Sequence, residues 1–200
     1  MPPENLWQPG QQIEPAGEVT DWVKENFILE GSPLTNEDHA HLRAADLHFL
    51  YTNVPYTDGD VPVVGMAELV KVGGKPWAQA ERVDQLCLLH GKIPKMRVWL
   101  YAPFMAVADP WTFCAVIEHE LYHYFQKPDK EGQPKFDPEG LPVWGTRAHD
   151  VEEFIGVMAR YGVDACRGRS REFVEAAMRP PLIAPAQTPF SVACACGARL

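Results

Sequence analysis

The sequence predicts a single α+β domain, on the evidence of one strongly signalled helix, an amphipathic helix after it and two strand-like segments before it. The chain has 200 residues, a length typical of one domain, and 46% of them are apolar, which is enough for a sizeable core. We expect the domain over residues 21–180. Prolines are frequent in residues 1–20 and again in residues 181–200, so both ends are expected to be irregular.

Upstream of the strongest helix signal, the residue pattern predicts one helix and two strands. Residues 36–50 are expected to be helical, because apolar side chains recur at helical spacing and Asn36 is a suitable cap. Residues 61–72 and 97–101 are rich in β-branched and aromatic side chains, which favour strands. Residues 77–90 fit neither pattern clearly. The backbone edge of the strand over residues 97–101 could hold an extended peptide.

The strongest helix signal begins at Asp109. Aspartate is a favoured N-cap, and Pro110 occupies the first helical position, where the missing N–H of proline is tolerated. We expect this helix to continue to Lys127 and to end before Pro128. Apolar residues occupy almost every side of it, which is typical of a buried helix.

This helix contains an HExxH motif with two histidines, His119 and His123, and an acidic residue, Glu120. Positions i and i+4 lie about 40° apart on a helix, so both imidazoles can reach one metal ion. Glu120 lies beside the pair and suits a general base that takes a proton from a metal-activated water. The three could instead be surface residues, but their burial without partners would be costly, and a bound Zn²⁺ removes that cost.

A catalytic zinc site needs a third protein ligand and an open fourth position. The candidates lie on the next helix, expected over residues 150–161, whose apolar stripe faces away from them. His149 is favoured as the third ligand, followed by Glu153 and then Glu152. Each could also be a solvated residue on a polar helix face. Asp150 could orient a ligand imidazole by accepting its hydrogen bond.

Composition argues against several classes of protein. The net charge is -9 and there is no basic run, which argues against nucleic acid as a partner. No apolar stretch reaches the ~18 residues of a membrane span, and no signal peptide is evident, so a cytoplasmic protein is expected. The five cysteines do not suggest a disulfide framework. Cys194 and Cys196 have no second pair nearby, so a zinc ribbon is not expected and their role stays open.

Two sequence blocks resemble the phage metallopeptidase family. They read C-A-V-I-E-H-E-L-Y-H-Y-F and H-D-V-E-E-F-I-G-V-M-A-R-Y-G, and weaker similarity extends the resemblance to residues 36–165. The second block is also similar to the third-ligand region of SprT-like peptidases, which supports His149. The resemblance implies a small zincin-like fold, with a short β-sheet packed on the HExxH helix and the third ligand on the following helix. It also implies an origin in a phage or prophage.

The favoured hypothesis is a zinc-dependent metallopeptidase that hydrolyses peptide or protein substrates by metal-activated water, with Glu120 as the general base. One alternative is a catalytically silent zincin-fold binding protein of phage or prophage origin with a structural zinc. Another is a hydrolase of cell-wall amides. The intact Glu120 favours an enzyme, because a structural site has no use for a base and usually fills all four positions with protein ligands.

Overall fold

A computed structural model of the chain describes residues 2, 10, 12–59, 61–151, 155–165, 169–183 and 193–194. The chain divides into two compact units. The first unit comprises residues 1–147 with 186–196, and it holds the sheet and the HExxH helix. The second comprises residues 148–185 with 197–200, and its described part holds short helices.

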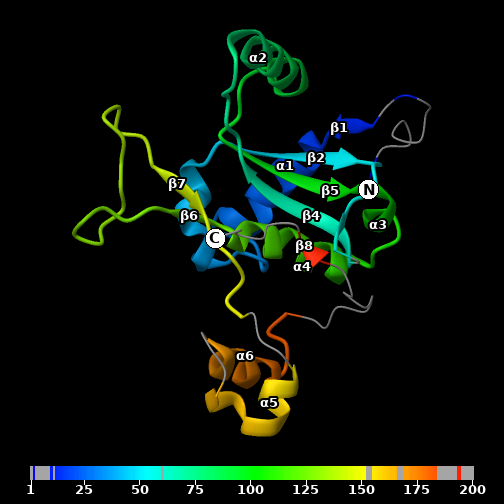
Figure 1. The fold of residues 1–200 in the computed structure, drawn as a ribbon, viewed down its shortest axis with the longest axis vertical. Helices are drawn as coiled ribbons and strands as arrows, with labels where there is room; N and C mark the ends of the chain where they lie inside the picture. Colours follow the sequence, from blue (N-terminus) through cyan, green and yellow to red (C-terminus); the bar gives the residue numbers. More distant parts are fainter. Residues whose placement is uncertain are drawn as a thin grey trace. The chain divides into compact units, whose positions relative to one another are not determined.

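A mixed β-sheet is the centre of the first unit (Figure 1). Its order is β1-β2-β5-β4-β3, and β8 pairs with β4. Strand β5 runs parallel to β2 on one side and antiparallel to β4 on the other, with Gly65 opposite Leu100. The α+β class predicted from the sequence is confirmed. The strands are β1 (Ile13–Pro15), β2 (Leu47–Thr52), β3 (Thr57–Asp58), β4 (Val61–Leu69), β5 (Met96–Tyr101) and β8 (Ala193–Cys194).

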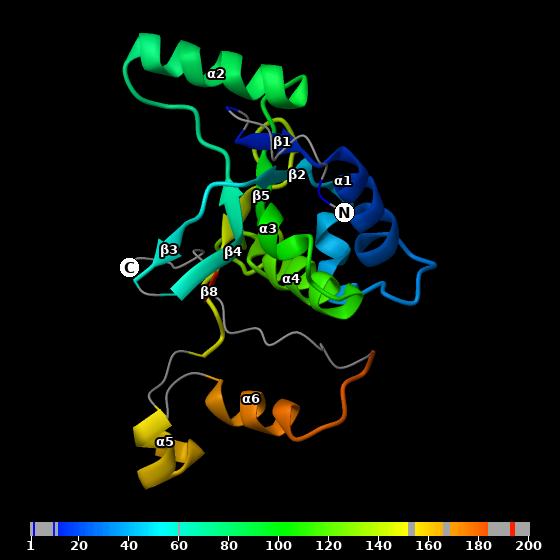
Figure 2. The same ribbon diagram turned by 90° about the vertical axis from the view of Figure 1, so that its right-hand side faces the viewer.

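One face of the sheet carries the apolar core and packs against helices, of which α1 (Gly17–Val23) and α4 (Pro110–Tyr122) lie on the same side (Figure 2). Short helices η2 (Lys24–Ile28) and α3 (Ala102–Met105) add to this layer. Full burial of a large apolar side chain contributes about 1.5–3 kcal/mol. Helix α4 is therefore fixed to the sheet mainly by its apolar face, whose buried members are Val116, Ile117 and Leu121.

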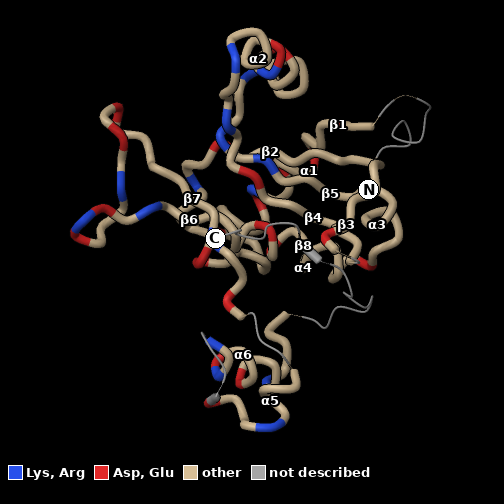
Figure 3. Tube along the Cα trace, in the orientation of Figure 1, with Lys and Arg blue, Asp and Glu red and all other residues tan. Residues whose placement is uncertain are grey.

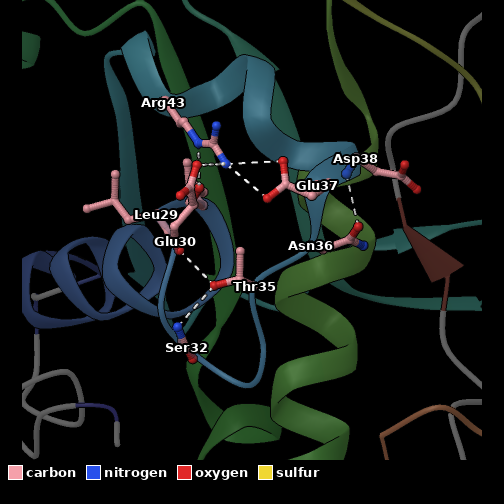
Figure 4. A network of polar contacts seen from close by, with 9 residues as sticks. Leu29, Glu30, Ser32, Thr35, Asn36, Glu37, Asp38 and Arg43 are labelled. Atoms are coloured by element: carbon pink, nitrogen blue, oxygen red, sulfur yellow. Dashed lines mark hydrogen bonds and ion pairs between the residues drawn. The ribbon is translucent and has the colours of Figure 1, made fainter.

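A polar network orders the segment that precedes β2 (Figure 4). The Thr35 hydroxyl donates to the carbonyl of Leu29 at 2.7 Å, and Arg43 forms an ion pair with Glu37 at 3.1 Å. Asn36 caps the 3-10 helix η3 (Glu37–Ala44) by accepting a hydrogen bond from an amide of its first turn.

Asn36 also connects this segment to α4. Its amide nitrogen donates to the Glu118 carboxylate at 2.7 Å and to the Tyr122 hydroxyl at 2.9 Å. The ring of His39, fully buried, packs edge-on against Tyr122 with ring centroids 4.6 Å apart. The last two turns of α4, which carry the HExxH motif, are thus tied to η3 as well as to the sheet.

Helix α2 (Pro76–His90) accounts for the region whose pattern was ambiguous. Only Leu86 is buried on it, and Trp77 is 92% exposed. Because so few apolar residues of α2 face the core, its sequence shows no clear amphipathic stripe. Gly91 ends the helix with a left-handed backbone, φ 71°, which glycine adopts without steric cost.

A two-stranded arm follows α4 directly. Strands β6 (Tyr124–Gln126) and β7 (Trp144–Thr146) pair antiparallel. Between them, the Asp129 side chain accepts from the amides of residues 131 and 133, and Asp137 does the same for residues 139 and 141. Figure 3 shows acidic and basic residues interspersed along this arm and along α2.

Three sequence expectations about the elements were wrong. Residues 47–50 form a strand, because they pair with β5, a partner that local spacing cannot reveal. Helix α4 ends at Tyr122 and not at Lys127, because the next residues pair with β7. Residues 149–151 are not helical, and the helix expected over 150–161 is described as α5 (Ile155–Tyr161), with residues 152–154 outside the described part.

The second unit, in its described part, contains α5, η4 (Val163–Ala165) and α6 (Ser170–Ala177). Ion pairs join Asp150 to Arg169 at 3.4 Å and Asp164 to Arg171. Among the described residues of both units, no helix combines the length and apolarity that a membrane crossing requires.

Candidate metal centre

Helix α4 positions the HExxH motif at its C-terminal end. The helix begins as expected at Asp109, whose carboxylate accepts from the amides of Trp111 at 3.0 Å and Thr112 at 3.1 Å. His119 lies in the last turn, and His123 is the C-cap residue. Both histidines remain one turn apart, because the backbone at His123 is still in the right-handed helical region.

The two imidazoles of the motif face each other. Their Nε2 atoms are 3.3 Å apart, and the ring planes meet at 71°. The Nδ1 atom of His123 lies 2.7 Å from the backbone carbonyl of Arg147. A carbonyl only accepts hydrogen bonds, so Nδ1 carries a proton, and in the neutral imidazole Nε2 then keeps its lone pair. His123 is therefore held in the tautomer that binds a metal through Nε2.

Arg147 fixes the end of the helix by three further contacts. Its backbone amide donates to the His123 carbonyl at 2.9 Å, and its Nε donates to the Tyr122 carbonyl at 2.6 Å. Its guanidinium also lies over the Tyr122 ring, 5.6 Å from the centroid. These contacts satisfy carbonyl groups that the end of a helix leaves without partners, and they hold the backbone oxygen that orients His123.

His149 follows this anchored residue by two positions. One ligand nitrogen of each of His119, His123 and His149 lies within 4.8 Å of the others. The assignment of His149 as the third metal ligand remains a prediction. The alternatives Glu153 and Glu152 lie outside the described residues.

Asp150 is ion-paired with Arg169 at 3.4 Å. Its role in orienting an imidazole remains a prediction.

Glu120 is buried against strand β4 and is only 1% exposed. A Cβ added at Gly65 would lie 2.3 Å from the Glu120 Oε1, so only glycine leaves room for this carboxylate. The amide of Ala67 donates to the same carboxylate. Burial raises the pKa of Glu120 to about 8, while the Ala67 hydrogen bond acts in the opposite direction. A neighbouring cation would favour the charged carboxylate.

The donor set fits a divalent transition-metal ion. Three imidazole nitrogens are ligands that zinc and related ions prefer. The metal-binding tautomer of His123 is already selected by the Arg147 carbonyl. The buried acid beside the pair would otherwise carry a desolvation cost that a cation reduces. These residues form a candidate metal centre with an adjacent carboxylate, the combination used in metal-assisted hydrolysis.

The sequence profile of a family described as Putative phage metallopeptidase matches residues 20–178. The chain belongs to this family. The match includes strands β2 to β5 of the sheet, the HExxH helix, the arm and the described helices of the second unit, and it confirms the resemblance seen in the sequence. No curated protein and no solved structure matches the chain. Membership in the phage metallopeptidase family supports peptidase activity.

Two features of the site were missed from the sequence. The Arg147 carbonyl is a backbone group, so no residue type marks it. Gly65, by contrast, is a glycine inside a strand, and such a glycine often marks a close approach.

The peptide edge suggested on residues 97–101 was wrong. Strand β5 is paired on both sides, with β2 and with β4.

Proposed function

We propose that the chain is a zinc-dependent metallopeptidase with a zincin-like site. His119, His123 and His149 are the metal ligands and Glu120 is the general base. The observation that carries this proposal is the cluster of three imidazole nitrogens, each within 4.8 Å of the others, on and after a helix that also presents Glu120. The family match supports a peptidase independently of this geometry.

A bound Zn²⁺ would supply Lewis acidity, which polarises the scissile carbonyl and makes water a stronger nucleophile. The protein supplies the proton transfers. Glu120 takes a proton from the attacking water and delivers it to the nitrogen of the leaving amine. The Ala67 amide holds one position of its carboxylate, and the absence of a side chain at Gly65 lets that carboxylate lie directly against β4.

The geometry also favours polypeptide substrates. Glu120 contacts β4, whose side away from β5 pairs with the short strands β3 and β8. An extended peptide can bind such an edge by main-chain hydrogen bonds, with little dependence on its side chains. A peptide on this edge would lie next to the general base, which suits the hydrolysis of a peptide bond.

The test combines metal content with turnover of an unfolded protein such as casein. Glu120→Gln is isosteric and should keep one zinc per chain, while it lowers kcat by about 10²–10⁴-fold because the proton transfer is lost. Glu131→Gln makes the same chemical change at an exposed position of the arm and serves as the control. Equal turnover by the two variants would argue against Glu120 as the base.

The remaining outcomes separate the alternatives. A zinc-loaded wild type that leaves casein intact but clears a suspension of purified cell walls would be a cell-wall amide hydrolase. A zinc-loaded protein that acts on neither would be a catalytically silent zincin-fold binding protein with a structural zinc. Failure to bind metal when zinc is supplied would overturn the peptidase and both alternatives.

A further inference from the structure

Along the edge of β4 that faces away from β5, the amides of alternate residues have different partners. The Val63 amide donates to the carbonyl of Tyr56 at 2.9 Å, in the hairpin formed with β3. The Ala67 amide donates to the Glu120 carboxylate. Amides two residues apart on a strand point to the same edge, so the Gly65 amide faces the same side as that of Ala67. Gly65 is therefore the residue next to Glu120 whose backbone can pair with another strand on this edge.

Strand β8, from the C-terminal part of the chain, occupies this position. It pairs with β4 in the parallel direction, with Ala193 opposite Val63 and Cys194 opposite Gly65. Figure 2 shows β8 at the end of β4 that lies near α4. A segment almost 130 positions away in the sequence thus adds a strand at the residue against which the general base packs.

We propose that the edge of β4 at Gly65 is a binding surface for an extended polypeptide, and that the chain's own segment around Ala193–Cys194 is its resident occupant and competes with substrate. The competition rests on the proposed function, whereas the occupancy does not. The backbone groups of one edge can pair with only one strand at a time. A substrate that pairs at Gly65 must therefore displace β8.

The contact is weak enough to be displaced. Strand β8 has two residues, and parallel pairing is slightly less stable per residue than antiparallel pairing. Each backbone hydrogen bond contributes only a few-fold to an equilibrium constant after exchange with water. The tail would reduce the access of substrates to the edge without closing it. Substrates that pair over a longer stretch would be favoured over short peptides.

The occupancy is tested by amide hydrogen exchange at single residues of the full chain and of two truncations. Deletion of residues 191–200 removes β8, whereas deletion of residues 197–200 leaves it in place. We expect exchange at Gly65 to accelerate several-fold in the longer deletion alone. The amides of Val63 and Ala67 keep their partners within the first unit and serve as internal references. Unchanged protection of Gly65 after the longer deletion would overturn the occupancy.

The competition is tested by steady-state turnover of casein. The longer deletion should lower KM by roughly threefold to tenfold, the range expected for loss of a few backbone hydrogen bonds, with kcat unchanged. A synthetic peptide of residues 188–198, added in trans, should restore both KM and the protection of Gly65. If the longer deletion accelerates exchange at Gly65 but leaves KM unchanged, the competition is overturned. Loss of Gly65 protection with no turnover in any variant would support the occupancy and refute the peptidase.

Discussion

The first unit contains two pairs of histidines with nearly the same ring geometry but different surroundings. The rings of His119 and His123 have centroids 5.1 Å apart and meet at 71°. Those of His48 and His90 have centroids 4.9 Å apart and meet at 69°. By ring geometry alone, the two pairs could not be told apart as metal sites.

Their hydrogen bonds and neighbouring charges differ. The Nδ1 of His123 donates to a carbonyl, which leaves the lone pair of the neutral ring on Nε2, whereas the Nε2 of His48 is bound to Asp46 at 3.0 Å. Asp46 also pairs with Lys92 at 2.7 Å. Burial lowers the pKa of His90 to about 4, with further lowering by His48 and Arg97. The comparison teaches that the tautomer and the surrounding charge, more than ring spacing, distinguish the proposed ligand pair from the packed pair.

The largest expected effect is on metal content. His123→Ala removes a proposed ligand whose tautomer is preset, so zinc measured by elemental analysis should fall from about one per chain to a small fraction of that. His90→Ala removes a ring from the other pair and should leave zinc content unchanged. Retention of zinc by His123→Ala, or its loss in His90→Ala, would reverse the assignment of the two pairs.

A glycine near each pair gives a second contrast. Gly65→Ala places a methyl group against the Glu120 carboxylate and should cost about 1–3 kcal/mol of stability, as overpacking does. It should also lower turnover, because the carboxylate proposed as the base must move. Gly91→Ala, next to His90, meets no neighbouring atom but has φ 71°, and should cost about 1 kcal/mol with turnover intact. Urea unfolding and casein assays check both, and equal losses of turnover would contradict the placement of Glu120.

The smallest expected effect is a pH dependence at His90, whose ring is faced by His48, Arg97 and Asp46. Its pKa is lowered from 6.5 to about 4 in the folded chain, so the unfolded chain binds the proton more readily. The contribution to stability is complete above pH 6.5 and is lost as the pH falls towards 4. Urea midpoints with excess chelator should therefore fall less for His90→Gln than for the wild type between about pH 7.5 and pH 5. Parallel curves would show that His90 does not carry this dependence.

The sequence predicted the features that depend on local chemistry. Asp109 and Pro110 marked the start of α4 correctly, because capping involves only neighbouring residues. Composition also predicted strand β4, which is rich in valine, and strand β5. The HExxH pair was expected to converge from helix geometry alone, and the 3.3 Å distance between the two Nε2 atoms is consistent with that.

The features that depend on distant pairing were not predictable in this way. Residues 47–50 have apolar side chains that also fit helical spacing, and only the pairing with β5 makes them a strand. The end of α4 depends on Tyr124, whose hydroxyl is buried and donates to the Arg97 carbonyl at 2.5 Å. That bond and the pairing with β7 place Tyr124 in a strand, so the helix cannot continue past His123.

The arm between β6 and β7 has a consequence for labelling the protein. Its two turns are closed by their own aspartates, Asp129 and Asp137, and residues 129–135 and 138–141 are exposed. Exposed tips of this kind tolerate inserted sequence because no buried backbone depends on them. A fluorophore or affinity epitope placed between Glu139 and Gly140 would therefore leave both chain ends native. It would also leave the β6–β7 pairing at the base of the arm in place.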